Sequence, residues 1–199
     1  MATPSVEDDV AYLKQLAEAG ASGVPNGGKY FLVWAVAIAT GLGLTYLTVT
    51  DMVPIGRTGL NICWAGVIAA GWVASLLMGR ADAAKPEGLR FANRIVSATW
   101  IATGIALTAL WLGLMVSGTH QAIMMPIASA AIGVSLAVSA TVFRLNWLYA
   151  VAMVWWVVAF VSFLLLERIE FILFSAAVIL ALQGGTGVAL LIQEGRRGR

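Results

Sequence analysis

The number of membrane spans depends on residues 95–143, which read IVSATWIATGIALTALWLGLMVSGTHQAIMMPIASAAIGVSLAVSATVF. These residues are predominantly apolar, yet one membrane helix needs only about 20 of them. The polar break SGTHQ, residues 117–121, divides them into two segments of sufficient length. Pro126 supports the division, because proline is tolerated in the first turns of a helix and disrupts its middle. We therefore predict two spans here, at residues 95–116 and 122–143.

Four further apolar segments of similar length occur along the chain, at residues 30–50, 59–79, 147–166 and 171–192. The 199-residue chain is 60% hydrophobic and 11% charged, whereas an average soluble domain is about 25% charged. This composition excludes a water-soluble enzyme, a disordered chain and a disulfide-stapled secreted domain. We predict an all-α polytopic membrane protein with six transmembrane helices, in contact with the lipid bilayer.

The basic residues indicate how the spans are oriented, because Lys and Arg accumulate near the cytoplasmic ends of membrane helices. Of the twelve, Arg57 and Arg168 would lie on one side of the membrane. The other ten would lie on the opposite side, together with both termini: Lys14, Lys29, Arg80, Lys85, Arg90, Arg94, Arg144, Arg196, Arg197 and Arg199. We therefore predict that both termini are cytoplasmic.

Residues 1–28 are predicted to form a cytoplasmic amphipathic helix followed by a flexible linker, ASGVPNGG. Val6, Val10, Leu13 and Leu16 recur near helical spacing and form a candidate partner-binding face. The helix is acidic, whereas helices that bind anionic lipid are rich in Lys and Arg. Two docking partners for this helix remain possible: the chain's own basic loops and a separate cytosolic protein. Residues 29–194 would form the transmembrane domain, and residues 195–199 a basic tail.

The sequence offers few groups for catalysis or metal binding. Cys63 is the only cysteine and His120 the only histidine, which argues against zinc and bis-histidine haem sites. Charged residues are absent from the middle of the predicted spans, where a proton-coupled pump or ion channel usually places one. The net charge of +2 is too small for a nucleic-acid footprint. We predict a non-enzymatic protein with no cofactor, no metal site and no nucleic-acid partner.

The most polar run at depth lies near the centre of the sixth predicted span. It consists of Gln183, Gly184, Gly185, Thr186 and Gly187. In one interpretation the glycines let a neighbouring helix approach closely, and the glutamine makes one interhelical hydrogen bond. In the other, the helix is locally unwound and its free backbone groups bind a small solute.

Two further patterns are open to a structural or a functional interpretation. Small residues recur every four positions, which favours packing within the chain or a homodimer: Ser129, Gly133, Ala137 and Thr141; Ala98, Ala102 and Ala106; Ala177, Ala181, Gly185 and Ala189. The eight tryptophans are the second pattern. Trp34, Trp64, Trp111 and Trp147 fit an interfacial aromatic belt. The other four, Trp72, Trp100, Trp155 and Trp156, fit either core or lipid contact, or the wall of a cavity for an apolar or aromatic ligand.

The segment EDDVAYLKQLAEAG, residues 7–20, precedes a Gly-rich break and GGKYFLVWAV, residues 27–36. This arrangement resembles a group of uncharacterised six-span bacterial membrane proteins with an acidic N-terminal helix. The resemblance implies a bacterial cytoplasmic (inner) membrane location and hints at a cytosolic regulator protein as a partner. It implies no site residue.

Two functional hypotheses follow from these patterns. The first is a sensing or regulatory membrane protein that acts through its N-terminal helix, motivated by that helix, the linker and the lack of catalytic groups. The second is a small-solute transporter or substrate-capture subunit with its site at residues 183–187.

Overall fold

The computed structural model describes residues 10, 27–82, 90–119 and 121–197. In this part of the chain, six helical segments are long and apolar enough to cross a membrane, which confirms the predicted number of spans. Five of the spans are α2 (Gly28–Val49), α3 (Gly56–Asp82), α4 (Arg90–Ser117), α5 (Met124–Phe143, preceded by the 3-10 turn η2, Gln121–Ile123) and α6 (Asn146–Leu165). The sixth span comprises α7 (Glu170–Val178), the π-helical turn η3 (Ile179–Gly184) and α8 (Gly185–Arg197).

The break between the third and fourth spans is a tight turn. Helix α4 ends at Ser117, and Gly118 follows with φ +70°, a conformation that glycine adopts readily. Pro126 is the third residue of α5, within the first turn as predicted. Helices α3 and α4 are longer than the predicted spans, since both continue through the polar residues at one end, including Arg80 and Arg94.

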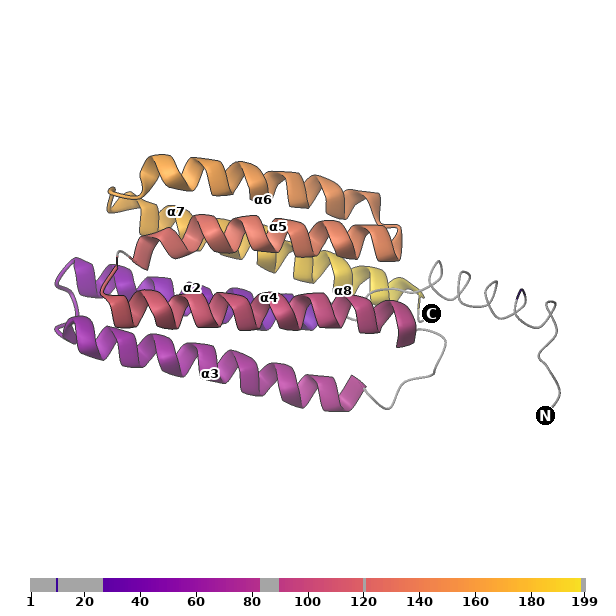
Figure 1. The fold of residues 1–199 in the computed structure, drawn as a ribbon, viewed down its shortest axis with the longest axis horizontal. Helices are drawn as coiled ribbons and strands as arrows, with labels where there is room; N and C mark the ends of the chain where they lie inside the picture. Colours follow the sequence, from indigo (N-terminus) through magenta and orange to yellow (C-terminus); the bar gives the residue numbers. More distant parts are fainter. Residues whose placement is uncertain (1–9, 11–26, 83–89, 120, 198–199) are drawn as a thin grey trace.

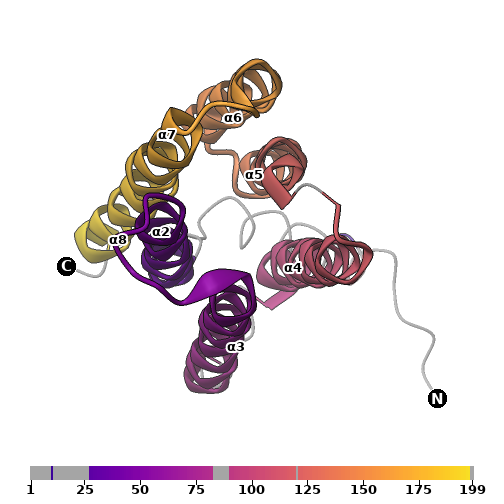
Figure 2. The same cartoon turned by 90° about the vertical axis from the view of Figure 1, so that its left-hand side faces the viewer.

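The six spans surround a central region in the order of the chain (Figure 2). The ring closes where α8 packs against α2, while α5 packs against both α4 and α6. The connections between the spans alternate between the two ends of the bundle (Figure 1). The end at which α3 and α5 finish is named here the Arg80 end, and the end with the α6–α7 connection the Arg168 end.

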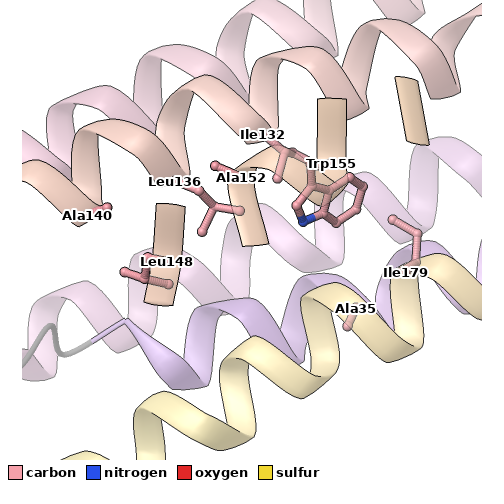
Figure 3. Close-up of a cluster of buried hydrophobic side chains, with 8 residues drawn as sticks. All are labelled: Ala35, Ile132, Leu136, Ala140, Leu148, Ala152, Trp155 and Ile179. Atoms are coloured by element: carbon pink, nitrogen blue, oxygen red, sulfur yellow. The ribbon is translucent and has the colours of Figure 1, made fainter. Parts of the chain in front are cut away.

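The apolar core lies where α5 and α6 face α2 and the sixth span (Figure 3). Trp155 is 1% exposed, and with Ile179 and Ala35 it joins residues from three spans. The remaining core residues come from α5 and α6: Ile132, Leu136, Ala140, Leu148 and Ala152. This cluster occupies one side of the bundle and leaves the space between α2, α3 and α4 to be filled differently.

Candidate functional site

A large cavity lies alongside this core. Its volume is about 1670 Å³, and residues from all six spans line it. At the Arg80 end the lining includes Arg80, Arg94 and Glu194, and at the Arg168 end it includes Glu167 and Arg168. The cavity therefore extends along the length of the bundle. It exceeds the roughly 300–1,000 Å³ of pockets that hold drug-sized ligands.

Tryptophan rings form much of the wall. Five of the eight tryptophans line the cavity: Trp34, Trp64, Trp72, Trp100 and Trp111. The cavity interpretation of Trp72 and Trp100 thus agrees with the structure, whereas Trp155 is in the core. The belt interpretation was incomplete, because Trp34, Trp64 and Trp111 also face the interior. Trp156 lies instead on the outer face of α6, where it is 38% exposed.

Three of these rings make the same contact, which we call an indole clamp. The ring lies against a glycine of a neighbouring helix, and its Nε1–H donates to a Ser or Thr hydroxyl four residues further along that helix. The clamps are Trp34 with Gly71 and Ser75, Trp64 with Gly41 and Thr45, and Trp72 with Gly104 and Thr108. They join α3 to α2 twice and to α4 once.

The clamp geometry requires both the glycine and the hydroxyl. The indole nitrogens of Trp34, Trp64 and Trp72 lie 3.1, 3.0 and 3.2 Å from their hydroxyl oxygens. A Cβ atom on Gly41 would come within 2.7 Å of the Trp64 ring, so a larger residue there would displace the indole. Each clamp therefore satisfies the one polar atom of a tryptophan while its ring faces the cavity.

Helix α4 is attached to its other neighbours by similar means. Trp100 Nε1 donates to Ser139 Oγ at 3.1 Å, and the hydroxyls of Thr103 and Ser135 lie 2.8 Å apart. Trp100 also packs edge-on against Phe31 of α2, with ring centroids 4.9 Å apart. Polar atoms on this side of the cavity are thus already paired with one another.

The run 183–187 is helical rather than unwound. Gln183 and Gly184 end the π-helical turn η3, and Gly185 continues directly into α8 with φ −59° and ψ −43°. In an α-helix, residues spaced by four drift by about 40° per step around the axis. A π-helical turn holds more residues than an α turn and offsets that drift. Phe171, Ser175, Ile179 and Gln183 accordingly all face inward and line the cavity.

The glycines of this run have a different structural role from Gln183. A Cβ atom on Gly187 would lie 2.8 Å from the Gly28 carbonyl oxygen, and one on Gly28 would lie 2.7 Å from the Gly187 carbonyl oxygen. Gly187 therefore permits close contact between the first and last spans. A Cβ atom on Gly184 would lie 3.7 Å from Ala35, an ordinary contact, whereas Gly185 is exposed with open space around it. Thr186 is buried.

Gln183 is the residue of this run that lines the cavity. It lies thirteen residues from both Glu170 and Arg196, at the middle of the sixth span. The side chain is only 9% exposed. In the part of the chain that the structure describes, its amide has no hydrogen-bond partner. The structure thus places the amide of a largely buried side chain at the wall of an aromatic cavity, halfway along the bundle.

The structure does not bring the other predicted residues together at one site. Val6, Leu13 and Leu16 of the candidate partner face and His120 lie outside the described residues, while Val10 is helical and exposed. Cys63 is a half-buried free thiol on α3. Among residues 10, 27–82, 90–119 and 121–197, no three His, Cys, Asp or Glu side chains are grouped to hold a metal ion.

The small-residue stripes divide into buried and exposed sets. Ser129 and Gly133 are buried in the contact between α5 and α6, where the Trp156 ring covers Gly133. On α4, the stripe of Ala98, Ala102 and Ala106 is exposed, and so are Ala177, Ala181 and Gly185 of the sixth span. Packing within the chain thus explains Ser129 and Gly133 of the α5 stripe, whereas Ala137 is half-buried and Thr141 exposed. Homodimerisation through an exposed stripe stays a prediction.

A comparison of the chain with protein-family models, curated proteins and solved structures finds no match. The case for a function therefore rests on the cavity itself. Sequence reasoning missed the indole clamps, although each has a visible signal: a tryptophan on one span and Gly-x-x-x-Ser or Gly-x-x-x-Thr on an adjacent span.

Proposed function

We propose that this protein is a non-enzymatic membrane protein that binds a small apolar molecule in the tryptophan-lined cavity. The cavity of about 1670 Å³ carries the proposal. The middle of the wall is largely apolar and suits an apolar ligand, and aromatic rings supply large contact areas at little cost in conformational entropy. The clamps hold Trp34, Trp64 and Trp72 in place before a ligand arrives, which reduces the entropy lost on binding.

The biological role that we propose for this binding is sensing. The protein would reside in a bacterial inner membrane with both termini cytoplasmic, and occupancy of the cavity would be reported to a cytosolic regulator through the N-terminal helix. Support comes from the acidic helix, the Gly-rich linker and the resemblance of residues 7–36. Deletion of residues 1–20 is then expected to abolish recovery of a cytosolic partner in a pull-down. Identical partners with and without the helix would contradict the sensing role.

The binding proposal is tested by filling the cavity. Ala128 lines it, and the substitution Ala128→Phe would place a ring inside. The matched control is Ala150→Phe, on the exposed outer face of α6. The full chain in detergent micelles would be titrated with acetonaphthone, a flat, neutral aromatic ketone, and the quenching of tryptophan fluorescence would be recorded.

Saturable quenching is expected for the wild type and for Ala150→Phe. For Ala128→Phe we expect the affinity to fall about tenfold, because the ring occupies ligand volume worth a large part of one hydrophobic side chain. Non-saturable quenching that is equal in all three proteins would reflect partition into the micelle and would contradict the proposal. Thermal unfolding of each variant shows whether Ala128→Phe retains the fold.

Transport is the second candidate, and one observation favours it. The cavity is lined at both ends of the bundle, by Arg80 and Arg94 at one end and by Glu167 and Arg168 at the other. A carrier needs access from both sides, whereas a sensor needs access from one. Uptake of acetonaphthone derivatives that do not cross protein-free bilayers, measured in proteoliposomes, distinguishes the two roles.

A further inference from the structure

Among the described residues that line the cavity, Gln183 carries the buried amide side chain. The indole N–H groups of Trp34, Trp64, Trp72 and Trp100 each have a hydroxyl acceptor. Along the same helix face, Ser175 donates to the carbonyl oxygen of Phe171 at 2.7 Å. The Gln183 amide, 9% exposed and directed into the cavity, has no partner among the described residues.

The Gln183 amide lowers the stability of the protein unless a partner forms hydrogen bonds with it. Burying an amide in an apolar environment without a hydrogen bond lowers the stability of the fold. Of the hydroxyls that line the cavity, those of Thr103, Ser139 and Ser175 already make hydrogen bonds within the protein. A ligand oxygen can accept a hydrogen bond directly from the Gln183 amide.

We propose that Gln183 is the specificity-determining residue of the cavity and that it selects a neutral, flat, apolar molecule carrying a carbonyl or hydroxyl oxygen. The proposal rests on the binding function above. The ligand is neutral because Asp, Glu, Lys and Arg in the described spans occur only near the span ends, far from Gln183. It is flat and aromatic because five tryptophan side chains line the wall, and aromatic rings pack well against one another. Its oxygen is needed because an amide both donates and accepts hydrogen bonds.

The experiment compares two probes that differ by one oxygen. Acetonaphthone carries a carbonyl group, and ethylnaphthalene is of similar size and shape but has no oxygen. Dissociation constants for both are obtained from tryptophan quenching of the full chain in micelles. The proteins are the wild type, Gln183→Leu, and the control Gln193→Leu, which makes the same change on α8 at a residue that does not line the cavity.

We expect Gln183→Leu to weaken acetonaphthone binding about fivefold, the size of one net hydrogen bond. Ethylnaphthalene should bind Gln183→Leu as well as or better than the wild type. Gln193→Leu should leave both constants unchanged. The thermal midpoint of Gln183→Leu should equal or exceed that of the wild type, because an unpaired buried amide is removed. The variant is therefore expected to fold.

Two results would overturn the inference while leaving the proposed function intact. In the first, both probes bind saturably and Gln183→Leu changes neither constant. In the second, Gln183→Leu weakens both probes equally, which assigns Gln183 a packing role. Absence of saturable binding of either probe to the wild type would instead defeat the proposed function and this inference together.

Discussion

Helices α5 and α6 and the sixth span bury a third or more of their most apolar windows, 33%, 33% and 39% respectively, whereas α3 and α4 each bury 6%. On the first side, a small residue lets two helix backbones approach, as where Gly187 of the sixth span contacts Gly28 of α2. On the second side, formed by α2, α3 and α4, indole rings lie between the helices. Their Nε1–H groups donate hydrogen bonds to hydroxyls of the neighbouring helix. The same element type, an apolar helix, thus builds a solid core on one side and a cavity wall on the other.

The two sides also treat polar atoms differently. In the described part of the core side, four buried polar atoms have no hydrogen-bond partner: Ser129 Oγ, Ser162 Oγ, Trp147 Nε1 and Trp155 Nε1. Four indole nitrogens around the cavity are bonded to hydroxyls. Close packing tolerates unpaired atoms on the core side, while the loosely packed helices depend on hydrogen bonds for their position. Removing a hydroxyl should therefore lower stability on the cavity side and leave it unchanged or raised on the core side.

The largest effect is expected where two backbones touch. Gly187→Leu would drive a side chain into the Gly28 carbonyl and part α2 from α8, lowering the free energy of unfolding by about 3 kcal/mol or more. Gly185→Leu, two residues away on the exposed face, should be neutral or stabilising by up to about 1 kcal/mol through helix propensity. Unfolding by titration with sodium dodecyl sulfate measures both. Equal destabilisation would show that α2 and α8 are not in close contact.

An intermediate effect is expected from removing all three clamps. The triple variant Thr45→Val, Ser75→Ala and Thr108→Val deletes the hydroxyl acceptors and leaves the glycines in place. At about 0.6 kcal/mol for each interhelical bond, the sum is about 2 kcal/mol. Hydrogen exchange followed by mass spectrometry should show faster exchange in α3 and unchanged exchange in α5 and α6. Uniform acceleration across all spans would argue that the two sides do not behave separately.

The smallest change in stability is expected when a hydrogen-bonded hydroxyl and an unbonded one are removed in separate variants. Ser75→Ala removes the acceptor for Trp34 and should destabilise the protein by about 0.6 kcal/mol. Ser129→Ala removes a buried hydroxyl without a partner and should be neutral or stabilising by up to about 1 kcal/mol. Thermal unfolding in micelles compares the two. A greater loss for Ser129→Ala would mean that its hydroxyl is bonded in solution.

The sequence was sufficient to predict the spans, because length and hydropathy of each segment are local properties. It also located Gln183 at mid-span, since position along a helix follows from counting residues. It did not reveal that Trp64 and Trp111 face inward, because that depends on which helix stands beside them. The choice between an unwound and a helical 183–187 run likewise depended on the contact of Gly187 with Gly28, which joins residues from opposite ends of the chain.

That contact has a consequence for biosynthesis. Helix α2 is synthesised before its close partner α8, so the ring cannot close until α8 has been made. Domains emerge from the ribosome in N- to C-terminal order. Until closure, the tryptophan wall faces the surrounding lipid. A membrane-soluble ligand of the class proposed above would then reach the cavity during assembly, before α8 closes the ring.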